Sequence, residues 1–287
     1  MQIVTDGACD LAPEQIQGLD FHIIPLRLTL DGKTYLSGVD VQAAEFYNML
    51  TQTETMPTTT QPSAGEFAEV YRKLAQTDPE ILSIHLASGL SGTINAARAG
   101  ADLVPEAHVT VFDSRLLSAP LGWQVVAAAR AVRAGWPMER ILAMLEHLRE
   151  HSRGIVTLQV LKYVVHGGRI GHLRGWVGSL LNIKPIITWD KSDGKTEQAG
   201  QEITFKRATI RMAELISRWH RPGSKLMVQL LYGADSAVIA PIRERMGQLF
   251  DCTWMPSHTL APIFGCHSGP GVAGIAFIPQ DAWNKIP

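Results

Sequence analysis

The sequence contains few cysteines: among 287 residues there are three, Cys9, Cys252 and Cys266. They lie far apart and no C-x-x-C pair is present, so the sequence indicates no disulfide framework, structural zinc site or thioredoxin-type chemistry. Around His267, no second His, Asp or Glu lies at metal-ligand spacing, and we expect no metal ion there. The reducing cytoplasm is the expected location of such a chain.

An excess of charge of either sign is also absent. Twenty-six basic side chains are balanced by 27 acidic ones, giving a formal net charge of −1 at pH 7. This balance argues against a protein whose main task is to bind nucleic acid or an anionic membrane. No run approaches the roughly 18 apolar residues of a membrane-spanning helix. Asp6 precedes any long apolar stretch, so we expect neither a membrane anchor nor a secretory signal.

Apolar residues, in contrast, make up 46% of the chain, enough for a sizeable core. Strand-like apolar runs alternate with helical stretches of about 10–15 residues, a pattern typical of α/β proteins with mostly parallel sheets. At about 150 residues per domain, the length indicates two domains. We place the boundary where two long helical stretches end, which predicts an N-terminal α/β domain over residues 1–155 and a C-terminal one over 156–287.

Several local expectations place the polar segments. A strand over residues 81–86, a loop over 87–92 and a helix over 93–103 follow one another, and the next strand ends at Asp113. Residues 51–61 read as a polar loop and 183–203 as a hairpin. We expect a helix over 174–181 and a loop over 265–271 between the last two strands.

In open α/β sheets, ligands bind outside the carboxyl ends of the strands. Five polar segments lie after expected strands or before expected helices: T-T-T-Q-P-S at 58–63, A-S-G-L-S-G-T at 87–93, D-S at 113–114, G-G-R at 167–169 and C-H-S-G-P-G at 266–271. Ser91 opens a helix, where its hydroxyl and the free N–H groups of Ser91, Gly92 and Thr93 can converge on an anion. A plain N-cap serine, with no ligand, explains Ser91 as well.

The other segments also leave two interpretations open. The threonines at 58–60 can cap the following helix, or their surplus hydroxyls can bind a carboxylate or phosphate. His267 can bond a carbonyl in a tight turn, or, with a pKa near physiological pH, donate to a carboxylate. Arg169 begins a mild basic patch with His172 and Arg174, which we expect to be a solvated face.

Ser91 permits a hydrolase interpretation too. G-L-S-G-T at residues 89–93 has the first glycine and the serine of a G-x-S-x-G nucleophile elbow, but threonine replaces the second glycine. A Ser91–His267–Asp113 triad can be drawn, although any chain with ten histidines offers such triples. A hydrolase of acyl esters is therefore the weaker alternative.

Taken together, the segments resemble those of the DegV family over nearly the whole chain. Six ordered blocks carry the resemblance: I-V-T-D-G-A-C-D-L at 3–11, T-T-T-Q-P-S at 58–63, L-S-G-T at 90–93, V-F-D-S at 111–114, G-G-R-I at 167–170 with G-S-L-L-N-I-K-P at 178–185, and H-S-G-P-G at 267–271. Their order is more specific than any one block.

The resemblance implies a two-domain α/β fold that binds a long-chain fatty acid at the domain cleft, without cofactor, metal or catalytic residues. It implies that Thr59 and Ser91 hydrogen-bond the carboxylate with help from the Gly92 N–H. His267 would orient that network, and Arg169 would be a nearby basic residue. In bacteria with the matching system, a separate fatty acid kinase would phosphorylate the bound acid to an acyl phosphate.

A third interpretation is a regulatory protein that senses a lipid, which predicts a change of shape on ligand loss and a macromolecular partner.

The chain also departs from the family pattern at one position of the loop that carries Ser91. Ala87 stands where many members carry another serine, so the loop lacks one hydroxyl.

Overall fold

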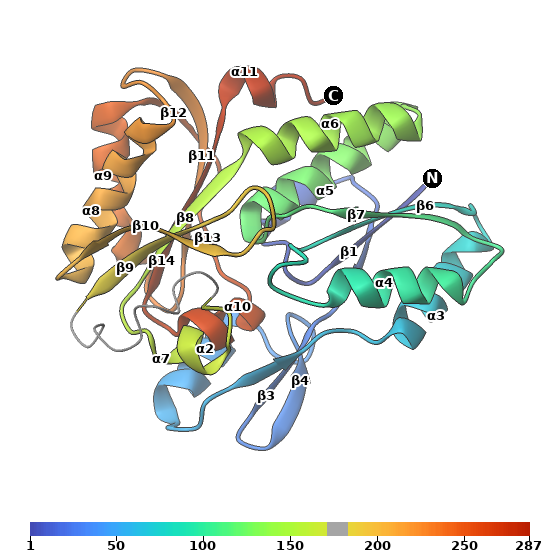
Figure 1. Ribbon diagram of the computed structural model, residues 1–287, viewed down its shortest axis with the longest axis horizontal. Helices are drawn as coiled ribbons and strands as arrows, with labels where there is room; N and C mark the ends of the chain where they lie inside the picture. Colours follow the sequence, from blue (N-terminus) through green and yellow to red (C-terminus); the bar gives the residue numbers. More distant parts are fainter. Residues whose placement is uncertain (171–182) are drawn as a thin grey trace.

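The computed structural model describes residues 1–170 and 183–287. The helix expected over 174–181, the residues His172 and Arg174, and most of the block at 178–185 lie outside the described residues. The described chain forms three sheets with helices packed around them (Figure 1). The expected α/β class is confirmed. No helix within these ranges is long and apolar enough to cross a membrane.

The first sheet is parallel, as expected, with the strand order β2–β1–β6–β7. Its strands are β1 (Gln2–Asp6), β2 (His22–Ile24), β6 (Glu80–His85) and β7 (His108–Asp113). On one face, Val4 and Ile81 pack with helices α3 (Ala64–Ala75) and α4 (Thr93–Asp102). On the other face, Ile3 and Leu82 join the cluster that contains helix α5 (Ser118–Arg133). The carboxyl ends of β1, β6 and β7 therefore meet at one edge.

The second sheet has the order β10–β9–β8–β14–β11–β12, with β13 also pairing β11. Its strands are β8 (Arg153–Leu158), β9 (Lys184–Trp189), β10 (Thr196–Glu202), β11 (Lys225–Tyr232), β12 (Asp251–Trp254), β13 (His258–Thr259) and β14 (Val272–Pro279). The expectation of mostly parallel strands is wrong here, because the pairs from β10 to β11 are all antiparallel. The expected hairpin is present as β9 and β10. Strand β14 lies between β8 and β11 and is antiparallel to both.

The smallest sheet has the order β4–β3–β5, formed by β3 (Arg27–Leu30), β4 (Lys33–Leu36) and β5 (Thr58–Thr60). Strand β5 lies inside the region expected to be a loop. Its three β-branched threonines suit an extended edge strand, and Thr59 pairs with Leu28. The remaining helices are α1 (Pro13–Ile16), α2 (Ala43–Gln52), α6 (Met138–His151), α7 (Lys162–His166), α8 (Phe205–Leu215), η2 (Ile216–Arg218), η3 (Ser236–Ile239), α9 (Ala240–Leu249), α10 (Pro262–Ser268) and α11 (Gln280–Trp283).

Helix α10 corrects a second expectation, because residues 265–268 of the expected loop over 265–271 belong to this helix. Gly265 lies in the middle of this helix because the rings of Phe46 and Tyr47 pack against it, and a Cβ there would be 2.7 Å from Phe46. The helix ends at Gly269, whose φ of +73° lies in the region that favours glycine.

Helix α5 joins the two large sheets. It is buried along almost its whole length and contacts β1 and β6 of the first sheet and β14 of the second (Figure 1). One apolar cluster accordingly contains Ile3 from the first sheet and Ala276 from the second. Strand β8 of the second sheet begins at Arg153, and the domain boundary at 155/156 stays a prediction.

Candidate functional site

An apolar pocket lies between the loops of the first sheet and the inner face of the second. It has an empty volume of about 1200 Å³, its open mouth included. Most of its wall is aliphatic, with side chains from the strands β8, β9 and β14 and from the segment before α5: Leu116, Leu117, Ile155, Val156, Leu158, Ile187, Val272, Ile275 and Ala276. A few polar groups interrupt this wall, the composition expected of a site for a largely apolar small molecule. They include Thr59, Ser91, Arg169 and His267.

Thr59 and His267 form one polar pair of the pocket. Thr59 lies on β5 and His267 in the last turn of α10, and the Thr59 Oγ1 and His267 Nε2 atoms are 3.0 Å apart. The other ring nitrogen, Nδ1, is buried and has no hydrogen-bond partner among the described residues. Gly167 lies directly against it: a Cβ at Gly167 would overlap Nδ1 and lie 2.8 Å from Cε1.

The protonation of His267 differs from the expectation. Burial, together with the smaller effects of the nearby Arg169 and His166, lowers the pKa of His267 to about 4. The expected pKa near physiological pH is therefore wrong. At neutral pH the imidazole is uncharged, so it donates from one nitrogen and accepts at the other.

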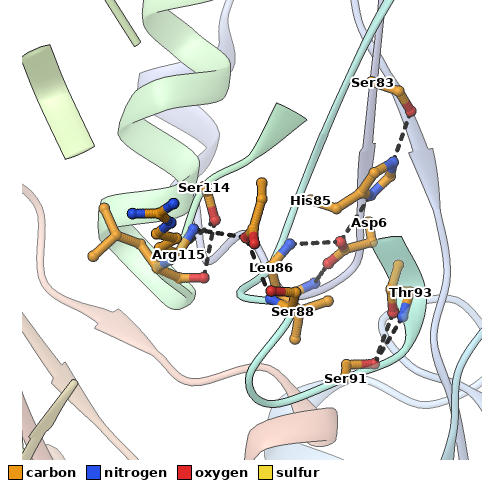
Figure 2. Close-up of polar contacts among 12 residues, drawn as sticks. Asp6, Ser83, His85, Leu86, Ser88, Ser91, Thr93, Ser114 and Arg115 are labelled. Atoms are coloured by element: carbon orange, nitrogen blue, oxygen red, sulfur yellow. Dashed lines mark hydrogen bonds and ion pairs between the residues drawn. The ribbon is translucent and has the colours of Figure 1, made fainter. Parts of the chain in front are cut away.

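Ser91 lies at the end of the loop after β6, one residue before Gly92, which is the N-cap of helix α4. The Ser91 Oγ accepts the Thr93 N–H at 3.3 Å and lies 2.8 Å from Thr93 Oγ1 (Figure 2). Ser91 is therefore not the N-cap residue that the sequence allowed, although its Oγ accepts the N–H of the first helical residue, and Ser91 also lines the pocket. Gly92 follows; a Cβ there would overlap the carboxamide of Gln61, with Nε2 2.9 Å away.

The sequence predicted Arg169 on a solvated face, and this prediction is wrong. Arg169 is half-buried in the pocket wall. Its guanidinium donates from Nε to the Leu90 carbonyl at 3.2 Å and from Nη1 to the Gly167 carbonyl at 2.6 Å. Two of its donors are therefore used on backbone oxygens beside Ser91 and His267. The guanidinium holds these two segments together at the pocket.

The triad of the hydrolase alternative is not assembled. His267 pairs with Thr59, Ser91 pairs with Thr93, and Asp113 accepts backbone N–H groups on the far side of the loop. Among the hydrogen bonds of the described residues, none joins Ser91, His267 and Asp113.

Several other pocket residues could not be singled out from the sequence. Gln61, Ser118, Trp189, Thr196 and Ser268 also line the pocket. Gln61 follows the threonines within the T-Q-P-S segment, and that proximity is the one signal that pointed to it. Within residues 1–170 and 183–287, no group of three or more His, Cys, Asp or Glu side chains is placed to hold a metal ion.

Comparison with known proteins identifies relatives that span nearly the whole chain. A DegV domain-containing protein of Staphylococcus aureus is 32% identical over 278 residues, covering 97% of this chain and 98% of that protein. A DegV domain-containing protein of Deinococcus radiodurans is 31% identical over 282 residues, covering 98% and 99%.

Solved structures give the same result. A DegV family protein from Thermus thermophilus, described as binding fatty acid, superposes with a TM-score of 0.85 at 29% identity, covering 97% of this chain and 99% of that one. DegV from Bacillus subtilis, described as a fatty acid binding protein, also superposes with a TM-score of 0.85. Its sequence is 27% identical, and the superposition covers 97% of this chain and 98% of that one. The family model described as "Uncharacterised protein, DegV family" matches residues 1–280, and the chain therefore belongs to the DegV family.

Proposed function

We propose that the protein binds one long-chain fatty acid, with the acyl chain in the apolar pocket and the carboxylate at Thr59, Ser91, Gly92, His267 and Arg169. The observation that carries this proposal is the aliphatic pocket with Thr59, Ser91, Arg169 and His267 in its wall. The fatty acid binding of the Thermus thermophilus and Bacillus subtilis relatives supports it.

The acyl chain supplies most of the affinity. About fifteen buried carbons at about 0.8 kcal/mol each give roughly 12 kcal/mol of gross transfer free energy for a 16-carbon acid. The lost motional freedom of ligand and side chains offsets part of this, so we expect a Kd in the micromolar to nanomolar range. The polar groups then fix which end of the ligand faces the mouth.

The head group is held mainly by neutral donors. With the uncharged His267 donating from Nε2 to Thr59 Oγ1, the Thr59 hydroxyl proton is directed to the ligand. With Thr93 Oγ1 as the donor in its 2.8 Å contact with Ser91 Oγ, the Ser91 hydroxyl proton is directed to the second carboxylate oxygen. Arg169 contributes positive charge, but two of its N–H groups are already used on carbonyls. The carboxylate is thereby oriented without a tight bidentate ion pair.

This arrangement suits a protein that presents the acid to an enzyme. A carboxylate that is not neutralised by a tight salt bridge keeps more of its nucleophilicity toward ATP. We propose that a separate fatty acid kinase in the cytoplasm converts the bound acid to an acyl phosphate, and that this chain has no catalytic role.

Mass spectrometry of the small molecules released from the denatured purified protein tests the binding. We expect about one fatty acid per chain, and its identity would give the chain length. Absence of a fatty acid, with no binding when one is added back, would refute the proposal. For the presentation step, Ser91→Ala should slow acyl phosphate formation by a fatty acid kinase; an unchanged rate would contradict the role of Ser91.

A further inference from the structure

The loop between β6 and α4, residues 86–92, carries Ser91, and two carboxylates hold its backbone. Asp6, at the end of β1, accepts the Leu86 N–H at 3.0 Å (Figure 2). Asp113, at the end of β7, accepts the Ser88 N–H at 3.2 Å. Because β1 and β7 flank β6 on its two sides, the loop is fixed to both neighbouring strands.

The two carboxylates differ in their surroundings. Asp6 is completely buried and also accepts the Ala8 N–H and His85 Nδ1, both at 2.9 Å. The other ring nitrogen of His85, Nε2, forms a hydrogen bond with the Ser83 hydroxyl in the interior of the sheet (Figure 2). Substitution of Asp6 would therefore disturb the core itself. Asp113 is half-buried, and its carboxylate accepts from backbone N–H groups, so its role can be tested with less risk to folding.

The second N–H that Asp113 accepts comes from Arg115, at 2.9 Å. Arg115 has a φ of +53°, which a residue with a side chain adopts only where the surroundings impose it. In this conformation its Nη1 reaches the Lys191 carbonyl at 3.3 Å, in the turn between β9 and β10. Asp113 thus binds the Ser91 loop with one contact and positions the link to this hairpin with the other.

The hairpin covers the loop from the opposite side. A Cβ at Gly89 would lie 2.9 Å from Cγ of Lys195, and a Cβ at Gly194 would lie 2.5 Å from Cβ of Ala87. Such close approaches leave the loop no room to shift toward the hairpin. Its position is therefore set by the carboxylates on one side and the hairpin on the other.

We propose that Asp113 is a positioning residue of the carboxylate site, a role that rests on the proposed fatty acid binding. Asp113 is not a pocket-lining residue. It acts through Ser88 and Arg115, which fix the loop and the hairpin that packs on it. The loop then presents the Ser91 hydroxyl and the Gly92 N–H at a constant spacing to the ligand head group.

Affinities for two probes of equal chain length, hexadecanoic acid and hexadecan-1-ol, separate positioning from a general structural role. Asp113→Ala should weaken binding of the acid about tenfold and that of the alcohol less than twofold, because a shifted loop misplaces Ser91 and Gly92, whose hydrogen bonds to a charged carboxylate are stronger than those to a neutral hydroxyl. Asp113→Asn should bind the acid nearly as wild type, since its amide oxygen still accepts N–H. Asp235→Ala is the matched control: Asp235 accepts the Ala237 N–H at 2.8 Å in a similar turn, and this variant should leave both affinities unchanged.

Equal losses for the acid and the alcohol, or an unchanged affinity for the acid, would overturn the role of Asp113. If Asp113→Ala does not fold, Arg115→Gly tests the hairpin link, because glycine adopts a positive φ without strain. This variant should weaken binding of the acid several-fold and leave binding of the alcohol unchanged. An unchanged affinity for the acid would overturn the positioning role of Asp113. A wild-type protein that binds no fatty acid would refute the proposed function as well, a result visible without any variant.

Discussion

Gly167→Ala is expected to weaken fatty acid binding while leaving the fold intact. Gly167 has a φ of −68°, an ordinary helical value, so alanine meets no backbone strain there. Helix propensity alone would make the substitution neutral or stabilising by about 0.5–1 kcal/mol. The effect on binding must therefore come from the space that the new methyl group occupies.

That space is taken by His267. The new Cβ would overlap Nδ1 and lie 2.8 Å from Cε1, and the Tyr163 carbonyl at 3.2 Å limits retreat of the backbone. The ring must move by about 1 Å to reach an ordinary contact distance. The bond between Thr59 and His267, 3.0 Å long, then exceeds the range of a hydrogen bond. Loss of one such bond is worth about 1–1.5 kcal/mol, or roughly a tenfold rise in Kd for the acid.

Isothermal titration with hexadecanoic acid measures this change, and thermal unfolding monitors the fold. Gly247→Ala is the matched control, since it lies in helix α9 with no atom within 4 Å of the new methyl group. The reasoning would be refuted if Gly167→Ala bound the acid like wild type. It would also be refuted if the weaker affinity for the acid were accompanied by a lower melting temperature, because the loss of binding would then follow from a disturbed fold.

Three further results are expected. Thr59→Val keeps the β-branched shape of the strand residue but removes the hydroxyl, so calorimetry should show about a tenfold weaker affinity for the acid with an unchanged melting temperature. Burial raises the pKa of Asp10 to about 7 from 3.8, against the hydrogen bonds from Ser118 and Ala261. A carboxyl group whose pKa is higher in the folded than in the unfolded state stabilises the fold at a pH below its unfolded-state pKa. This stabilisation is lost as the pH rises through the folded-state pKa of about 7. Denaturation at pH 4 and pH 8 should therefore show wild type losing about 4 kcal/mol relative to Asp10→Asn, and parallel pH profiles would contradict this. Gly100→Ala places a Cβ 2.5 Å from that of Phe67, between α3 and α4, so urea denaturation should show a loss of about 1–3 kcal/mol; an unchanged midpoint would contradict the packing.

Much of the first sheet could be predicted from the sequence, because its strands are short apolar runs that alternate with helices. The run that forms β6, the loop after it and helix α4 all lie where the pattern placed them. The direction of strands in the second sheet could not be predicted. A fully buried strand such as β14 presents apolar side chains on both faces, and that pattern is the same whichever way its neighbours run.

The missed helix α10 has a tertiary cause. Gly265 and the following Cys-His-Ser-Gly segment have poor helix propensity, and the helix forms because α2 packs its aromatic rings against the glycine. The same limit applies to the site. Motifs pointed to Thr59, Ser91, Arg169 and His267, which line one pocket. The low pKa of His267 arises from burial and from a cation distant in sequence, and no local pattern encodes either.

The place of β14 in the second sheet has a consequence for biosynthesis. This strand follows every other described strand in the chain, yet it lies between β8 and β11. While the ribosome is still making residues 272–279, β8 and β11 present unpaired edges of the kind that promote association with other chains. Ile275 and Ala276 of the same strand form part of the pocket wall. The pocket wall is therefore completed only after the rest of the sheet has been synthesised.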